Sequence, residues 1–567
     1  MKKILGAAVG GCVHVAGILS FLSSANKIGF QTKFLGTAVS AENLLKEINN
    51  FKPDIIGLSY RLSPESAEKI FRQLKQKLDL NLDKSAKEKV SLILGTTKPV
   101  AAALKKTGLF EMFEYVFTGG EKVVEIEAFL KNIQEESIYP YRKKSDGLKM
   151  LDTIKPSTPP QNLPDRIKFK KPFPLLRHHF GRPSLEETIE GIKIIAESGL
   201  IDIVSIGPDQ NAQEFFFNPE KMDNKKDGAG GVPIRSAKDL KMLYSASRTG
   251  NYPLMRCYSG TNNVLKFAEV LTKTINNAWC AVPLCWYNEL DGRSHRKLED
   301  SIAENQSVMK WHAQKDIPVE VNESHQWSLR YTSDSVAVAT AYLAAYNAKK
   351  MGVATYVSQY MFNTPPETSF TMDLAKMLAK IEMIEALHDD NFKSIRQTRT
   401  GLYSMSGTFK ENKGQLASST LLQMQLDPEI VHVVAFCESE HAAKPDDIIE
   451  SAEIVKKVIE NYLNGCPDMK NERSVKERKA RLISDANLIT GAIKKLDSSK
   501  KYEDPLVIPE IIGKAIRTGI LDSPHLIGSS TAKGKMTTMF FNGACMAVDE
   551  FCRPLSEAAR LAEILFA

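Results

Sequence analysis

Short apolar runs alternate with amphipathic stretches over the first 135 residues of the chain. The run Ile4–Val9 is followed by a stretch with helical spacing, Ala16–Ile28, and the same order then recurs. Strands that alternate with helices form parallel sheets that carry helices on both faces. The pattern therefore predicts a doubly wound, flavodoxin-like α/β domain over residues 1–135. Its five strands are expected at Ile4–Val9, Gln31–Leu35, Asp54–Ser59, Val90–Leu94 and Tyr115–Phe117.

The N-terminal segment also has a second interpretation. Lys2 and Lys3 precede an apolar run that extends to Leu22, and the residues before Cys12 are similar to a lipoprotein cleavage site. These are features of a secretory signal. However, His14 interrupts the apolar run, and the segment continues directly into the strand–helix–strand pattern. The pattern therefore favours the first strand of the domain.

The alternation stops over residues 136–170, which are rich in Lys, Pro and Ser, and resumes afterwards with a longer period. The interruption is typical of a linker. The later alternation predicts a (β/α)8 TIM-type barrel over residues 171–465, whose site lies at the carboxyl ends of its strands. Residues 466–567 are expected to form a C-terminal extension that packs on the barrel. The eight strands are expected at Pro174–His178, Asp202–Ile206, Pro253–Cys257, Ala278–Leu284, Val319–Asn322, Thr355–Gln359, Gly401–Met405 and Ile430–Phe436.

Composition narrows the class of protein. The 75 basic and 68 acidic residues are interleaved, so the net charge of +7 forms no basic block that would indicate nucleic acid. Beyond the N-terminal apolar run, no other stretch approaches the ~20 apolar residues of a membrane span. The eight cysteines show neither closely spaced zinc-binding pairs nor the density of a disulfide scaffold. We expect a cytoplasmic protein with reduced thiols and with neither a nucleic-acid nor a membrane partner.

The turn after the first strand carries the first candidate chemistry. It reads Cys12-Val13-His14-Val15-Ala16-Gly17, and the third strand ends at Ser59. These residues resemble the cobalamin-binding, Rossmann-like domain of base-off, His-on enzymes, whose signature is Asp-x-His-x-x-Gly, Ser-x-Leu and a later Gly-Gly. The resemblance implies that His14 binds the cobalt of cobalamin. It implies that the cofactor also contacts Gly17, Cys12, Val13, Ser59, Arg61, Gly95, Thr96 and Gly119.

Three positions depart from that signature. Cys12 stands where an aspartate would hydrogen bond the ligand histidine, which changes the group that orients the imidazole. Arg61 replaces the leucine of Ser-x-Leu, and Thr96 replaces the second glycine. A single histidine in a strand–helix turn is more often structural than a metal ligand, but the surrounding matches favour the ligand.

The second half of the chain resembles the large subunit of glutamate mutase (methylaspartate mutase) over about residues 170–560. The resemblance lies in the shared order of Gly181-Arg182-Pro183, Pro253-Leu254-Met255-Arg256, Val321-Asn322-Glu323, Ala515-Ile516-Arg517-Thr518-Gly519-Ile520-Leu521-Asp522-Ser523-Pro524 and Gly534-Lys535-Met536. It implies a fusion of the small cobalamin subunit with the barrel subunit. It also implies that Arg182 and Arg256, beside Arg177, bind substrate carboxylates, which suits the planar guanidinium.

The barrel also departs from that family. A further arginine is missing after the second strand, where Ala212 stands, so we expect a substrate other than glutamate. On the eighth strand Cys437 replaces a lysine, and Glu440 and His441 surround the place of a glutamate. We expect catalytic residues at strand ends, namely Glu323, which matches a family glutamate, Glu440, His441 and Tyr287.

The leading hypothesis is an adenosylcobalamin-dependent carbon-skeleton mutase that uses radical chemistry on a small carboxylate-bearing substrate. The replacement at Cys437 leaves a cobalamin-dependent methyltransferase open, and the changed signature leaves a non-catalytic cobalamin-binding or sensor protein open. We also consider a homodimer that forms through the barrel. The fusion predicts that His14 lies at the carboxyl edge of its sheet and faces the barrel mouth in at least one conformation.

Overall fold

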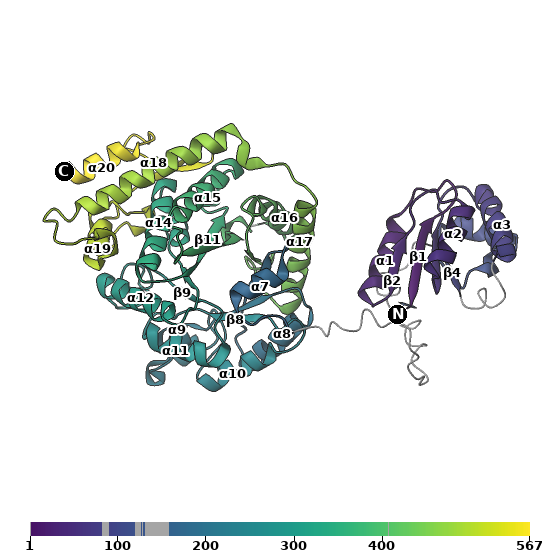
Figure 1. Ribbon diagram of the computed structural model, residues 1–567, viewed down its shortest axis with the longest axis horizontal. Coiled ribbons are helices and arrows are strands. Elements are labelled where there is room, and N and C mark those ends of the chain that lie inside the picture. Colours follow the sequence, from purple (N-terminus) through teal and green to yellow (C-terminus); the bar gives the residue numbers. More distant parts are fainter. Residues whose placement is uncertain are drawn as a thin grey trace. The chain divides into compact units, whose positions relative to one another are not determined.

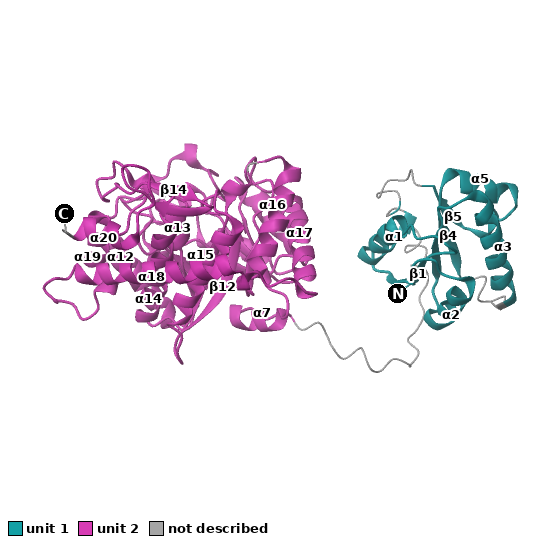
Figure 2. Ribbon diagram, turned by 90° about the horizontal axis from the view of Figure 1, so that it is seen from above, with its two compact units in different colours: residues 1–153 teal, residues 154–567 magenta. Residues whose placement is uncertain are grey.

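The computed structural model describes residues 2–81, 90–118, 126, 129–130, 158–405 and 407–566. It separates into two compact units, residues 1–153 and 154–567 (Figure 2). Among the described residues, no helix has the length and apolar character needed to cross a bilayer.

The first unit is a five-stranded parallel sheet with the strand order β2-β1-β3-β4-β5, as in flavodoxin-like folds (Figure 1). Helix α1 covers one face, and α2, α3 and α5 cover the other. Each strand lies within one residue of its predicted position. The elements are β1 (Lys3–Ala8), α1 (Ala16–Lys27), β2 (Gln31–Phe34), α2 (Ala41–Phe51), β3 (Ile55–Ser59), α3 (Pro64–Asn81), β4 (Ser91–Gly95), α5 (Lys98–Lys106), η1 (Phe110–Met112) and β5 (Tyr115–Phe117).

Helix α1 packs unusually close to this sheet because two glycines lie side by side beneath it. Gly6 of β1 pairs with Gly57 of β3. A Cβ atom on Gly6 would lie 2.6 Å from the Leu22 side chain, and one on Gly57 would lie 3.0 Å from Ile18. The close approach fixes the helix that begins directly after the His14 loop.

The second unit contains an eight-stranded parallel sheet with the order β8-β7-β6-β13-β12-β11-β10-β9. The sheet is nearly closed. At the seam between β8 and β9, the Ala278 amide donates to the Met255 carbonyl at 2.9 Å, and Asn277 Oδ1 accepts from the Cys257 amide at 3.1 Å. The strands are β6 (Leu175–Phe180), β7 (Ile203–Ile206), β8 (Leu254–Cys257), β9 (Cys280–Val282), β10 (Val319–Val321), β11 (Thr355–Phe362), β12 (Lys393–Thr400) and β13 (Ile430–His432).

Helices surround these strands, as the ring of coiled ribbons in Figure 1 shows. They are α8 (Leu185–Glu197), α9 (Gln210–Phe215), α10 (Ala237–Ala246), α11 (Val264–Ile275), α12 (Leu298–Ala313), α13 (Ser324–Ser328), α14 (Asp334–Lys350), α15 (Phe370–Glu385), α16 (Phe409–Met424) and α17 (Pro445–Leu463). The short η2 (Pro219–Lys221) and η3 (Asn224–Lys226) follow α9. The architecture is therefore the predicted α/β type, a TIM-like barrel with a separate Rossmann-like unit.

The seventh barrel strand corrects the sequence analysis. It was expected at Gly401–Met405, but β12 spans Lys393–Thr400, and residues 402–404 form the short helix η4. Ile395 is the one apolar residue of this strand, because the inward side chains of Gln397 and Arg399 alternate with polar ones on the other face. A search for apolar runs therefore selects the wrong segment.

Helix α7 (Leu163–Lys170) lies inside the segment predicted as a linker. The Asn162 side chain caps its first turn by accepting from the Asp165 amide at 3.0 Å. Arg166 is buried and donates to the carbonyls of Pro160 at 2.8 Å and Tyr252 at 2.7 Å. The helix packs with the apolar residues at the amino ends of the strands, so the structured barrel unit begins before residue 171.

The C-terminal segments pack against the barrel helices. Apolar residues of α18 and α19 share one core with those of α12 and α14. Beside this core, the buried Lys376 of α15 pairs with Asp373 at 3.1 Å and with Asp334 at 3.3 Å. The segments comprise η5 (Met469–Asn471), α18 (Arg473–Lys495), η6 (Pro505–Val507), α19 (Pro509–Thr518), η7 (Pro524–Leu526), β14 (Thr538–Phe541), β15 (Ala544–Ala547) and α20 (Glu557–Phe566).

Candidate functional site

His14 lies on the loop that follows β1, at the carboxyl edge of the first sheet. Its side chain is exposed, whereas Cys12 is buried with its Sγ 3.7 Å from His14 Nδ1. The Ser59 hydroxyl, at the end of β3, donates to the His14 carbonyl at 2.8 Å. These contacts hold the loop, and among the described residues no group hydrogen bonds to His14 Nε2.

The loop lies at the point where the chain changes direction across the sheet. From β1 the chain continues to β2 on one side and then to β3 on the other, so the carboxyl ends of β1 and β3 flank the crevice where such folds bind ligands. Gly17, just inside α1, is exposed, and a Cβ atom there would meet nothing within 4 Å. The edge therefore offers open surface beside His14.

The other residues predicted to contact the cofactor have mixed settings. Gly95 pairs with Ser59 in the sheet, and Thr96 is buried with its hydroxyl donating to the Tyr60 carbonyl at 2.7 Å. Val13 and Arg61 are exposed. Gly119 lies outside the described residues.

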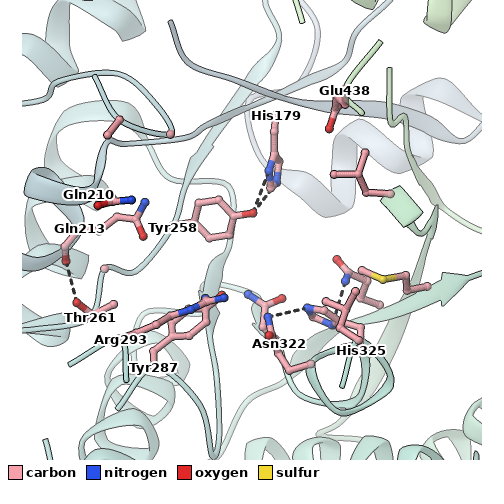
Figure 3. Close-up of a pocket in the computed structure, with 18 of the residues that line it drawn as sticks. His179, Gln210, Gln213, Tyr258, Thr261, Tyr287, Arg293, Asn322, His325 and Glu438 are labelled. Carbon is pink, nitrogen blue, oxygen red and sulfur yellow. Dashed lines mark hydrogen bonds between the residues drawn. The ribbon is translucent and has the colours of Figure 1, made fainter. Parts of the chain in front are cut away.

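A cavity of about 1040 Å³ opens at the carboxyl ends of the barrel strands (Figure 3). The floor of the cavity is lined by alternate residues at the ends of successive strands, because positions i and i+2 of a strand point to the same face. The pairs are Arg177 and His179, Arg256 and Tyr258, Glu320 and Asn322, and Gln359 and Met361, with Arg399 from β12.

The floor of the cavity carries more positive than negative charge. Arg177 and Arg256 are fully buried and share the buried carboxylate of Glu320, at 3.7 and 3.3 Å. Arg399 adds a third guanidinium to the lining. Burial, together with Arg256, holds the pKa of Arg177 well below its usual range. The whole lining contains four arginines and Lys226 against the carboxylates of Glu214, Glu320 and Glu438, so the cavity favours an anionic ligand.

Arg256 and Arg177 differ in what their donors bind. Arg177 donates Nε to the Ser205 hydroxyl at 2.7 Å, Nη1 to Gln397 at 2.5 Å, and Nη2 to His179. Arg256 Nε and Nη1 are buried and have no hydrogen-bond partner among the residues that the structure describes. Buried donors of this kind are costly unless a ligand accepts from them. Arg256 therefore has more donors than protein partners, and the partly buried Arg399, whose Nε donates to the Thr400 carbonyl at 3.2 Å, adds a second guanidinium that can bind a ligand.

His179 and Tyr258 form a polar pair above this floor, and Figure 3 shows their side chains pointing toward each other. Burial, with the charge of Arg177, lowers the pKa of His179, so its ring is neutral. Because Arg177 donates to Nε2, the ring hydrogen lies on Nδ1 and donates to the Tyr258 oxygen at 2.9 Å. The Tyr258 hydroxyl hydrogen is then available to a ligand in the cavity.

Two further groups complete the cavity wall. His325 Nδ1 accepts from Gln359 Nε2 at 3.1 Å, and burial lowers the pKa of this histidine as well. Tyr287 stacks against the Arg293 guanidinium, with 4.4 Å between the guanidinium carbon and the ring centroid. Burial raises the pKa of Tyr287 to about 12, so its hydroxyl remains protonated.

The structure places two of the predicted carboxylate-binding arginines, Arg177 and Arg256, in the cavity lining together with Tyr287. Arg182 does not line the cavity. Its Nη1 donates to the Ala442 carbonyl at 2.9 Å, and its Nε lies 3.5 Å from Glu187. The arginines that line the cavity are therefore Arg177, Arg256 and Arg399 at its floor and Arg293 in its wall.

Glu323 also lies outside the lining. It is buried and accepts from the amides of Leu284 and Cys285, at 2.9 and 3.0 Å, and from Trp327 Nε1 at 2.7 Å. Burial raises the pKa of this carboxyl group. The hydrogen bonds of Glu323 hold the loop that follows β9 against helix α13.

Glu440 and His441 lie on a turn beyond β13, which ends at His432 and not at Phe436 as expected. Neither residue lines the cavity, whereas their neighbours Glu438 and Ser439 do. Glu438 accepts from the Ala435 amide at 3.0 Å and lies 3.1 Å from His178 Nε2.

The sequence analysis missed His179, Tyr258, Glu320 and Arg399, although the signal for them was present. Each belongs to an alternation of polar residues within a strand, such as Arg177-x-His179 and Gln397-x-Arg399. In a barrel this alternation marks the inward face, so polar alternation at strand ends predicts cavity residues.

No protein-family model and no curated protein matches the chain. A solved cobalamin-binding protein from Desulfitobacterium hafniense DCB-2 is 20% identical with a TM-score of 0.19, and the match covers 24% of this chain and 58% of that protein's length. Brucella abortus NtrX, solved with ATP, is 11% identical with a TM-score of 0.16, over 88% and 94% of the two chains. The cobalamin-dependent S-adenosylmethionine radical enzyme OxsB is 10% identical with a TM-score of 0.18, over 88% and 68%. TM-scores this low indicate neither the fold nor the function of this chain.

Proposed function

We propose that this protein is a cobalamin-dependent enzyme that acts on a small carboxylate-bearing substrate in the barrel cavity. Two arrangements support the proposal. The first is the exposed His14 imidazole, which has one ring nitrogen beside Cys12 and the other available. The second, which carries the substrate assignment, is the pair of buried donors on Arg256 that have no partner.

The residues of the first unit fit a cobalt ligand and its surroundings. Metal-binding histidines usually have their second nitrogen oriented by a neighbouring group, and Cys12 occupies that place for His14 Nδ1. Nε2 would then bind the cobalt, and the open surface at Gly17 would accept the cofactor's nucleotide tail. Cobalamin, when bound, would supply cobalt–carbon chemistry that amino-acid side chains lack.

The cavity would bind the substrate carboxylate at its floor. Arg256 would donate Nη1 to the carboxylate, Arg399 would add a second guanidinium, and Tyr258 would donate its hydroxyl. His179 and His325 are neutral, so the positive charge that would attract the substrate carboxylate comes from the arginines. A barrel cavity of this kind would shield reactive species from water once its mouth is covered, which favours a carbon-skeleton mutase that uses adenosylcobalamin.

Cobalamin binding by two histidine variants tests the cofactor assignment. His14→Ala should weaken binding by at least about tenfold, because the ligand to cobalt is lost. His295→Ala removes another exposed histidine and should leave binding unchanged. Equal affinities for the two variants, measured by absorbance titration with hydroxocobalamin, would contradict the assignment.

Electron paramagnetic resonance tests the reaction class. Protein loaded with adenosylcobalamin and mixed with a panel of small dicarboxylic and amino acids should give a substrate-dependent cob(II)alamin signal with at least one of them. Arg256→Lys should abolish that signal, because an ammonium group cannot bind Glu320 and the substrate carboxylate at once with the fixed planar geometry of a guanidinium. Transfer of a methyl group from methylcobalamin would instead show a methyltransferase. Inert binding would show a cobalamin-binding protein without catalysis.

A further inference from the structure

A second group of metal-ligand side chains lies on the turn after β13, outside the cavity lining. Cys437 and His441 are four residues apart, and the amides of Glu440 and His441 both donate to the Cys437 carbonyl, at 2.9 and 3.0 Å. This helical turn places both side chains on one face. Asp447 joins them from the first turn of α17. One ligand atom from each of the three lies within 4.8 Å of the others.

The spacing of these atoms suits a tetrahedral ion. His441 Nε2 lies 3.2 Å from Asp447 Oδ2. Zinc bonds of about 2.0–2.1 Å to nitrogen and oxygen, at the tetrahedral angle, separate the two ligand atoms by about 3.3 Å. Asp447 Oδ2 also accepts from the Lys444 amide at 2.9 Å, a contact that would orient the carboxylate of a metal site.

The surroundings hold the turn in place without an ion. Asn412 Nδ2 donates to the Phe436 carbonyl at 2.9 Å and contacts the Ser439 hydroxyl at 3.3 Å. The Phe409 ring lies against His441, with 5.9 Å between ring centroids. Asp447 caps the start of α17 by accepting from the Lys444 amide, and this cap does not require a thiol or an imidazole beside the carboxylate. These contacts therefore hold the three side chains close together before any ion binds.

We propose that Cys437, His441 and Asp447 bind one Zn²⁺ ion and leave its fourth position to water. A thiolate, an imidazole and a carboxylate together favour zinc over magnesium or calcium, which take oxygen ligands. Cys437 is buried, whereas the side chains of His441 and Asp447 are 37% and 20% exposed. The ion can therefore enter from the solvent side.

The zinc ion would tie the turn that carries Glu438 and Ser439 to helix α17. Both of these residues line the cavity, so the ion would position one wall of the substrate site. None of its ligands belongs to the unit that carries His14. Zinc binding and cobalamin binding can therefore succeed or fail independently.

Zinc and Co²⁺ titration of the demetallated, cobalamin-free full chain tests the site. We expect about one zinc ion per chain and, with Co²⁺, a thiolate-to-metal charge-transfer band. Cys437→Ser should remove the band, and His441→Ala and Asp447→Asn should weaken zinc binding by at least about tenfold. Cys552→Ser, which removes the exposed cysteine, should change neither.

Two results would overturn the proposal. One is the absence of stoichiometric zinc in the wild-type chain. The other is binding that persists unchanged in the Cys437 and His441 variants, which would indicate adventitious metal. His441 is partly exposed, so its replacement leaves the core intact, and circular dichroism of the zinc-free variants controls for folding.

Discussion

At the scale of single residues, the barrel floor is built around charges that are only partly balanced. Arg177 and Arg256 share Glu320, whereas no carboxylate among the described residues lies within salt-bridge distance of Arg399. Burial lowers the pKa of Arg399, which reflects the cost of keeping it charged. The unliganded barrel therefore carries a cation that a substrate would neutralise.

Replacing this cation should stabilise the unliganded protein. We expect Arg399→Gln to raise the free energy of unfolding by about 1 kcal/mol, because one of three neighbouring positive charges is removed. Arg396→Gln, on the outward face of the same strand, should lower it, because Arg396 binds Glu385 at 2.6 Å. Urea unfolding measures both. A loss of stability in Arg399→Gln equal to that in Arg396→Gln would contradict this account.

The buried histidines make stability depend on pH. His432 lies between Arg177 and Arg399 in the sheet register, and burial followed by the charge of Arg177 lowers its pKa well below 6.5. Its folded-state pKa is below the unfolded value, so the unfolded chain binds the extra proton as the pH falls below about 6.5. Its contribution to stability is complete above that pH and is lost as the pH falls toward the folded-state pKa.

A variant isolates this histidine. Between about pH 7.5 and about pH 5.5, His432 should account for a loss of about 1.4 kcal/mol in the free energy of unfolding. His432→Asn should reduce the wild-type loss by that amount, as urea unfolding at the two pH values would measure. An unchanged pH dependence in the variant would show that His432 is protonated in the folded protein.

At the scale of elements, apolar runs located the strands of the first unit within one residue and failed for β12. The reason is physical. The inner strands β1 and β3 of the first sheet are buried on both faces, so they are apolar runs, whereas β12 turns Gln397 and Arg399 into a polar barrel interior. Glu320 and His179 were not predicted as site residues for the same reason. Their strands were identified from neighbouring apolar residues, and the polar side chains that point into the barrel were not considered.

Helix α7 provides a test at this scale, because its role depends on one side chain. Arg166 donates to three backbone carbonyls, those of Pro160, Asn251 and Tyr252. Arg166→Ala should destabilise the barrel unit by about 2–3 kcal/mol, since buried carbonyls lose their donors.

The neighbouring Lys168→Ala is the matched control for that helix. Lys168 is 75% exposed and contacts only Asp165 among the described residues, so its loss should change stability by less than about 0.5 kcal/mol. Thermal unfolding of the two variants compares them. Equal effects would show that α7 is not part of the barrel's structural core.

At the scale of the whole molecule, the cofactor loop and the cavity belong to different units. His14 is held by contacts with Cys12 and Ser59, and all three residues belong to residues 1–153. The cavity is lined by residues of the other unit, residues 154–567. The order of strands and helices predicted both architectures. The chemistry of the cavity depended on which side chains point inward, and that followed only from the barrel's geometry.

The central claim is that His14 binds the cobalt of cobalamin, and isotope labelling tests it directly. Protein labelled with ¹⁵N in all its histidines and loaded with unlabelled cob(II)alamin is examined by electron paramagnetic resonance. Each cobalt line should be split into a doublet by ¹⁵N, and His14→Ala should abolish that doublet. A triplet, from the ¹⁴N of the cofactor's own base, or a doublet that persists in His14→Ala, would contradict the account.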